Sequence, residues 1–184
     1  MNTLSFLTAG ECVLVVIDIQ GKLSKSVYEA DKFMDNLLRM IQGAGVMNIP
    51  VVLTEQYPQG LGPTVPEVLD LLPGIQPVPK RSFSCWGEQQ FVTRLVANGR
   101  KQILLTGIES HVCVYQTAID LLKAGYGVHA ITECISSRTQ ENRRLGLTRM
   151  QEAGARLTGV EMLLFELLKA AEGDKFKAIS KIVK

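Results

Sequence analysis

Short apolar runs alternate with longer amphipathic stretches along this chain. Residues Cys12–Ile17 form a continuous apolar run, rich in β-branched side chains, that ends at Asp18. A strand buried on both faces has this pattern. In Lys32–Met47 the apolar residues recur at a helical spacing, which predicts an amphipathic helix. The chain therefore begins with a buried strand followed by a helix.

The same two patterns, together with glycines that close helices, predict the remaining elements. We predict strands at Pro50–Thr54, Ile75–Val78, Gln102–Thr106, Val128–Thr132 and Arg156–Thr158. We predict helices at Glu88–Asn98, Ser110–Ala124 and Ser137–Ala153, and at residues 160–171 and 174–183. Residues 56–74 are rich in Gly and Pro and predict a long loop with one helical turn.

Strands that alternate with helices predict an α/β fold, in which a doubly wound parallel sheet lies between two layers of helices. The chain has 184 residues and no Ser/Gly/Pro-rich linker, so we expect a single domain over residues 1–184. Ligands of such sheets bind beyond the carboxyl ends of the strands. The polar residues expected there are Asp18, Gln20, Glu55, Gln56, Lys80, Glu109 and Cys113.

The composition is that of an ordinary globular protein, with 46% hydrophobic and 21% charged residues and a formal net charge of +2. These values exclude a disordered or collagen-like chain. No apolar run approaches the roughly 18 residues of a membrane helix, so we expect no membrane partner. No basic run is interleaved with aromatic residues, so we expect no nucleic-acid partner. No Lys or Arg precedes Lys22, so we expect neither a secretory signal nor a transit peptide.

The four cysteines form no C-x-x-C pair, and the chain has only two histidines. We therefore expect no disulfide framework and no metal site. Free thiols are typical of a reducing compartment, and we expect a cytoplasmic protein. The open question is whether one of the four thiols is a nucleophile.

Cys113 is the best candidate for a nucleophile because it lies near the start of a predicted helix, just after a strand that ends in Thr106-Gly107. The positive field of a helix N-terminus favours a thiolate, and the turn offers backbone N–H groups to a developing oxyanion. The alternative is a small helix residue packed on the sheet, since free Cys is among the most buried residue types.

Asp18 and Lys80 are the charged residues that could assist this thiol. Asp18 follows a buried strand, and it is read either as a general base or as a turn former. Lys80 would stabilise the carboxylate and favour a thiolate, or else it is a solvated surface lysine. The adjacent Arg81 is an equal candidate for the inward cation.

Other residues near these ends have weaker assignments. We expect Gln20, Gln56, Phe83 and Trp86 to line a substrate pocket. Cys134, at the predicted end of a strand, is placed at the pocket rim. His111 invites a Cys-His dyad, but residues two apart on a helix face different ways, so we favour a structural or rim role for it.

Three segments, taken in order, resemble the isochorismatase-like cysteine hydrolases. They are Val15–Gln20 (a strand followed by Asp-x-Gln), Val78–Phe83 (Lys followed by Ser-x-Phe) and Thr106–Val114 (a Gly six residues before Cys-Val). The match covers nearly the whole chain. Segments 53–62, 136–138 and 176–179 are similar to the isochorismatase domain-containing branch of this family.

The resemblance implies a six-stranded sheet and an Asp–Lys–Cys triad of Asp18, Lys80 and Cys113. In this family the Asp takes the thiol proton, and the thiolate attacks the carbonyl or nitrile-like carbon of a small amide-like molecule. Water then releases the acid from a thioester or thioimidate. The resemblance also implies a cis peptide bond between Ile108 and Glu109, with the N–H groups of Glu109 and Cys113 forming the oxyanion hole. It implies no cofactor, a small-molecule substrate and a homo-oligomer, either a dimer or a tetramer.

Two departures from the family pattern leave alternatives open. Glu55-Gln56-Tyr57-Pro58 stands where the nicotinamidase branch has an Asp-x-His metal motif, so we predict no catalytic metal. Ser110-His111 stands where many relatives have Thr-Asp. The alternatives are vinyl-ether hydrolysis that uses Asp18, and a non-catalytic binding or scaffold protein. The apolar residues near 162–168 exceed one helix face, which favours either an oligomer contact or packing on the chain's own core.

Overall fold

The computed structural model describes residues 5–184 and contains a six-stranded sheet. The strands are β1 (Cys12–Ile17), β2 (Val51–Gln56), β3 (Val78–Lys80), β4 (Gln102–Ile108), β5 (Gly127–Ser136) and β6 (Arg156–Thr158). All neighbours are parallel, in the order β3-β2-β1-β4-β5-β6. The strand order reverses between β1 and β4, where a doubly wound sheet opens a crevice at its carboxyl edge. The predicted sheet is confirmed.

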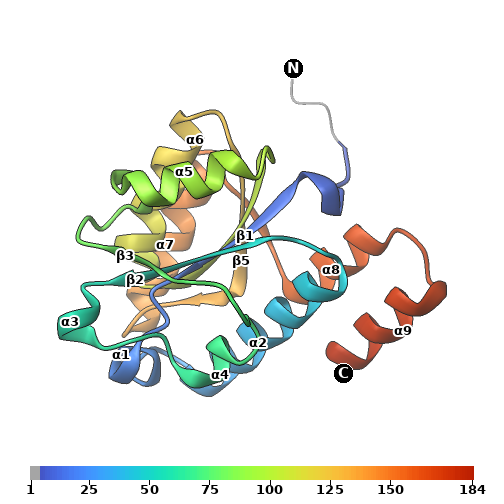
Figure 1. Cartoon of the computed structure of the whole chain (residues 1–184), viewed down its shortest axis with the longest axis horizontal. Helices are drawn as coiled ribbons and strands as arrows, with labels where there is room; N and C mark the ends of the chain where they lie inside the picture. The colour runs from blue at the N-terminus through green and yellow to red at the C-terminus, as the bar shows by residue number, and fades with distance from the viewer. Residues whose placement is uncertain (1–4) are drawn as a thin grey trace.

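Helices cover both faces of the sheet (Figure 1). They are α1 (Gly21–Lys25), α2 (Ala30–Val46), α3 (Pro58–Leu61), α4 (Pro66–Leu69), α5 (Gln89–Ala97), α6 (Tyr115–Lys123), α7 (Gln140–Glu152), α8 (Val160–Leu168) and α9 (Gly173–Ile182). In Figure 1, α5, α6 and α7 lie on one face, and α2, α8 and α9 lie on the other. Short 3₁₀ turns at Ala9–Glu11 and Cys85–Gly87 and a π-helical turn at Ser110–Val114 complete the elements.

The central position of β1 explains its unbroken apolar sequence. Leu14 and Val16 point into the core beneath α2 and α8, whereas Val13 and Val15 point into the core beneath α5 and α6. All four side chains are 0% exposed. At the end of β1 the backbone of Asp18 takes a left-handed conformation, with φ of 59°, which Asp tolerates better than most residues. The chain therefore leaves the sheet with Asp18 at its carboxyl edge.

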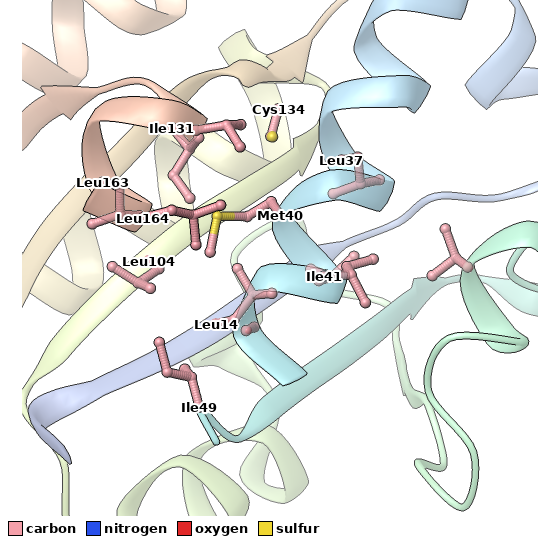
Figure 2. Close-up of a cluster of buried hydrophobic side chains, with 14 of the residues drawn as sticks. Leu14, Leu37, Met40, Ile41, Ile49, Leu104, Ile131, Cys134, Leu163 and Leu164 are labelled. Atoms are coloured by element: carbon pink, nitrogen blue, oxygen red, sulfur yellow. The ribbon is translucent and has the colours of Figure 1, made fainter. Parts of the chain in front are cut away.

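The core beneath α2 and α8 contains the C-terminal apolar residues. Figure 2 shows Met40 of α2 beside Leu164 of α8, with Leu163 of α8 and Leu104 of the sheet on the same side of α2. Most of the apolar residues near 162–168 therefore pack on the chain's own core rather than being left for an oligomer contact. Met162, which is 67% exposed, is the member that points outward.

Several predicted boundaries were wrong. The strand β3 spans Val78–Lys80 rather than residues 75–78, so Lys80 belongs to the strand itself. The strand β5 continues past the polar pair Thr132-Glu133, and this places Cys134 in the apolar core at 0% exposure instead of at the pocket rim. Helix α7 begins at Gln140 with Thr139 as its N-cap, three residues after the predicted start.

Candidate active site

The carboxyl ends of three strands bring Asp18, Lys80 and Cys113 together. Asp18 follows β1, Lys80 ends β3, and Cys113 lies in the π-helical turn that links β4 to α6. Their exposed fractions are 1%, 2% and 7%, so the cluster is almost entirely removed from solvent. Lys80 is thus the inward cation, while the neighbouring Arg81 is exposed and stacks over the ring of Tyr57 at 4.0 Å.

The ammonium of Lys80 is surrounded by oxygen atoms. Its Nζ lies 2.8 Å from Asp18 Oδ2 and donates to Gln56 Oε1 at 2.5 Å. It also donates to the carbonyls of Ser82 and Phe83 at 3.3 and 3.1 Å. Burial lowers the pKa of Lys80, but the negative charge of Asp18 and the neighbouring thiols raise it above its ordinary value. Lys80 is therefore a fixed positive charge rather than a proton donor.

The two carboxylate oxygens of Asp18 have different surroundings. Oδ1 accepts a hydrogen bond from Thr54 Oγ1 at 2.8 Å. Within residues 5–184, Oδ2 has the Lys80 ion pair but no hydrogen bond of good geometry. A carboxylate oxygen has two lone pairs, and the ammonium of Lys80, whose three protons are shared among four oxygens, occupies at most one of those on Oδ2. Oδ2 therefore keeps a lone pair that is free to accept a proton.

The thiol of Cys113 lies beside both Asp18 and Gln56. Its Sγ is 3.9 Å from Gln56 Oε1. Burial, followed by the charge of Asp18, raises the pKa of Cys113 to about 12, although Lys80 opposes this shift. Burial and the charge of Asp18 therefore favour the protonated thiol, in opposition to the field expected at a helix N-terminus. Cys113 needs a base to become a nucleophile, and Asp18 is the adjacent one.

The two glutamines predicted for the pocket have different roles. Gln56 faces the cluster through Oε1, while its Nε2 donates to the Arg81 carbonyl at 3.0 Å. Gln20 is 0% exposed and turned away from any ligand. Its amide accepts from the Gln56 N–H and donates to the carbonyls of Gln56 and Gly62. Gln20 therefore holds the loop after β2 in place.

Glu88 supports the site through hydrogen bonds and was not predicted from the sequence. Its Oε1 accepts from the N–H groups of Arg81 and Ser82 and from the Ser82 hydroxyl, at 2.8–3.1 Å. These bonds lower the pKa of Glu88. The carboxylate fixes the turn whose carbonyls receive Lys80. A single polar residue before a helix gives no motif, so the folded loop was needed to reveal it.

Of the two aromatic residues predicted for the pocket, Phe83 contacts the buried cluster through its carbonyl, whereas Trp86 packs elsewhere. Phe83 is 54% exposed, at the surface of the loop after β3. Trp86 packs edge-on against Tyr126, with ring centroids 5.8 Å apart. Tyr126 directly precedes β5, so Trp86 points toward the amino edge of the sheet, away from Asp18.

The predicted oxyanion segment is tied to the loop after β5. The peptide bond between Ile108 and Glu109, where the resemblance implies a cis bond, is cis. The Glu109 side chain accepts from Arg138 Nε at 2.9 Å and from the Arg138 N–H at 3.1 Å. His111 Nδ1 bonds the Ser137 hydroxyl at 3.0 Å, which agrees with a structural role.

Residues 5–184 contain no group of three or more His, Cys, Asp or Glu side chains placed to hold a metal ion. In the same range no helix has both the length and the apolar character required to cross a membrane. All four cysteines are free.

Comparison with known proteins identifies relatives along nearly the whole chain. The family model described as "Isochorismatase domain" matches residues 12–162. Isochorismatase domain-containing protein 2 of Danio rerio is 37% identical over 171 residues, which are 93% of this chain and 86% of that protein. A protein of Phytophthora sojae named as a secreted isochorismatase effector is 38% identical over 94% of this chain and 84% of its own length.

Solved structures with the same fold include three informative neighbours. A protein described as MAR1 ribonuclease from Caenorhabditis elegans superposes with a TM-score of 0.90 at 32% identity, over 97% of this chain and 92% of its own. YcaC from Escherichia coli, described as an octameric hydrolase of unknown specificity, has a TM-score of 0.93 at 26% identity, with coverages of 99% and 91%. YcaC from Pseudomonas aeruginosa, solved with covalent acrylamide, has the same score and identity, with coverages of 100% and 92%.

Proposed function

The chain belongs to the isochorismatase family of hydrolases, and we propose that it is a cysteine hydrolase acting on the C–N bond of a small amide-like molecule. The observation that carries this proposal is the buried convergence of a thiol, a carboxylate and an ammonium at the carboxyl ends of β4, β1 and β3. A buried carboxylate with a free lone pair beside a thiol is a base and nucleophile pair.

In the proposed reaction, Asp18 removes the thiol proton as Cys113 Sγ bonds to the substrate carbonyl carbon. The carbonyl oxygen becomes an oxyanion, which the N–H groups of Glu109 and Cys113 receive. The oxyanion then collapses, the C–N bond breaks, and Asp18 returns the proton to the leaving nitrogen. Water next attacks the thioester with Asp18 as base. The acid product leaves, and Sγ regains a proton.

Lys80 stays beside Asp18 through this cycle, and the two form an ion pair in the steps where Asp18 carries no proton. Its positive charge lies 2.8 Å from Asp18 Oδ2 and faces the carboxylate directly. It also offsets part of the negative charge that forms on sulfur. Because four oxygens surround its ammonium and its pKa is raised, we assign Lys80 an electrostatic role and no proton transfer.

Acrylamide alkylates nucleophiles through its vinyl group, so the covalent acrylamide in the Pseudomonas YcaC structure supports a reactive nucleophile in a protein of this fold. The ribonuclease description of the nematode neighbour makes RNA a second class to test. Vinyl-ether hydrolysis through Asp18 and binding without turnover are the further alternatives. We also propose that the chain acts as a homo-oligomer, as its octameric neighbour does, and in a reducing compartment that keeps Cys113 free.

A screen of small amides, nitriles, enol ethers and single-stranded RNA should be run with the wild type, Cys113→Ala and Asp18→Asn. We expect amide turnover that falls by about a thousandfold or more in Cys113→Ala, because no nucleophile remains. Enol-ether turnover that survives in Cys113→Ala and is lost in Asp18→Asn would favour the vinyl-ether reaction instead. If the wild type and both variants bind a ligand equally and none of them turns it over, the scaffold alternative would be favoured.

Alkylation of Cys113 tests the Asp18 assignment without a substrate. We expect the wild-type rate with iodoacetamide to change little between pH 6 and 8, because Asp18 takes the proton. In Asp18→Asn the rate should rise about tenfold per pH unit, as for an unassisted thiol far below its pKa. A steep wild-type profile that matches the variant would contradict the base assignment. Mass spectrometry of the Cys113 peptide gives the rates.

A further inference from the structure

Thr54 is a buried polar residue that follows the three apolar residues of β2, and it touches the proposed base. It lies in β2 opposite Ile17 of β1 and is 0% exposed. Its Oγ1 donates to Asp18 Oδ1 at 2.8 Å, and its carbonyl accepts from the Asp18 N–H at 3.2 Å. Thr54 therefore holds both the backbone and the side chain of Asp18.

A neighbouring thiol fixes the direction of the Thr54 hydroxyl proton. Cys85 Sγ donates to Thr54 Oγ1 across 3.8 Å. Burial, followed by the charge of Asp18, raises the pKa of Cys85 to about 11, so it stays a protonated donor. Because the Thr54 hydroxyl has a single proton and already accepts from Cys85, that proton is directed at Asp18.

The same chain of contacts reaches the helix that follows Cys113. The Cys85 N–H donates to Thr117 Oγ1 at 2.9 Å. Thr117 lies in α6, four residues beyond Cys113 and so on the same side of the helical turn. Thr54, Cys85 and Thr117 therefore link the strand that holds the base to the helix that follows the nucleophile.

We propose that Thr54 is a positioning residue that occupies Asp18 Oδ1, so that Oδ2 is the oxygen that accepts the Cys113 proton. This inference rests on the proposed function, because it concerns the same base and nucleophile. Without the hydroxyl, the carboxylate can rotate about its terminal bond. The carboxylate then points Oδ2 at Cys113 Sγ for only part of the time.

Thr106 provides a matched control. It is also a 0% exposed threonine near the end of a neighbouring strand, and its Oγ1 donates to a main-chain carbonyl, that of Val15, at 3.0 Å. Thr106→Val removes one buried hydroxyl of the same kind without touching Asp18. Any general effect of losing a buried threonine hydroxyl should appear equally in Thr54→Val and Thr106→Val.

The experiment measures the Cys113 alkylation rate from pH 6 to 8, together with the melting temperature, for Thr54→Val, Thr54→Ser and Thr106→Val. The titratable groups that face Cys113 are Asp18, Lys80 and Cys85, and all three are present in each variant. We expect the pH-independent rate to fall about tenfold or more in Thr54→Val, a part of the roughly hundredfold typical of general-base assistance. Thr54→Ser should restore it to within about threefold, and Thr106→Val should leave it within about twofold.

Once a substrate is known, kcat should fall in Thr54→Val with KM nearly unchanged, since Thr54 is buried beneath Asp18. Equal alkylation rates in Thr54→Val and Thr106→Val, at equal melting temperatures, would overturn the positioning role. Failure of the proposed function has a different signature: full turnover in Cys113→Ala, or a wild-type alkylation profile that matches Asp18→Asn. These two results are therefore separable from a null result in Thr54→Val.

Discussion

The four cysteines divide into two pairs on opposite faces of the sheet. Cys12 and Cys134 lie in the core beneath α2 and α8, whereas Cys85 and Cys113 lie in the core beneath α5 and α6. Burial raises the pKa of every one of them. It reaches about 12 for Cys12 and Cys113 and about 11 for Cys85, and it rises well above the ordinary value for Cys134.

Thiol acidity therefore does not separate the proposed nucleophile from the packing residues; the neighbouring groups do. The thiol of Cys12 donates to the Thr8 carbonyl at 3.2 Å, and a carbonyl cannot take its proton. Cys113 lies beside a carboxylate that can, and that carboxylate is paired with the ammonium of Lys80. The comparison indicates that a buried cysteine becomes a nucleophile through its base.

The largest expected effect comes from removing one thiol on each face. Cys113→Ala should lower turnover by about a thousandfold or more, because the attacking atom is lost. Cys134→Ala should leave kcat and KM nearly unchanged and cost about 1 kcal/mol of stability, the common value for a core substitution. Steady-state kinetics and urea denaturation of both variants check this. Comparable losses of activity in the two variants would break the comparison.

The next largest effect separates buried from exposed ion pairs. Lys80→Met keeps the chain shape but leaves Asp18 buried without a cation, which should cost about 3–5 kcal/mol and most of the activity. The matched control is Lys32→Met, which breaks an exposed pair with Glu29 and should change neither. Urea denaturation at pH 8 gives both values, and equal stability of the two variants would contradict the buried pair.

The raised pKa of Lys80 also predicts an alkaline signature for this pair. Its contribution to stability is complete below the ordinary value of 10.5 and is lost only as the pH rises through the higher folded pKa. In the wild type, the buried thiols, whose pKa values are raised from 9.0, should make stability fall from about pH 9, and Lys80 should add a further fall only above pH 10.5. Lys80→Met should lack that part of the fall.

The smallest effect concerns the turn that holds Lys80. Glu88→Gln should lower kcat roughly fivefold or less, because the neutral amide accepts the same N–H groups more weakly. The lowered pKa of Glu88 means that its contribution is present above its ordinary value of 4.5 and is lost as the pH falls through the folded pKa. An acid loss of activity that is identical in Glu88→Gln and the wild type would remove Glu88 from the site.

The sequence predicted the architecture well, because the apolar run Cys12–Ile17 matches β1 residue for residue. The positions of Asp18 and Cys113 at the carboxyl edge of the sheet were predicted from the ends of their strands and from the ordered motifs. Strand β3 was misplaced, since three residues that include Pro79 give too short a pattern. Trp86 was predicted to line the pocket, but spacing along the chain does not give the direction of a side chain, and its ring packs against Tyr126.

Thr54 and Glu88 were missed for a different reason. Each acts through one oxygen on a neighbour that is distant in sequence, and such pairs leave no periodicity or motif. In Thr54 the available signal was a polar residue closing the apolar run of β2.

Hydrogen bonds hold the loop after β2 at both of its ends. This arrangement bears on which part of the proposed site can change in sequence. Gln20 binds Gln56 and Gly62, and the Glu55 carboxylate accepts from the N–H and hydroxyl of Thr64 at 2.6 and 2.7 Å. The tip between these anchors, residues 58–61, shares none of those bonds. Substitutions or insertions in this tip should therefore leave Asp18 and Lys80 in place.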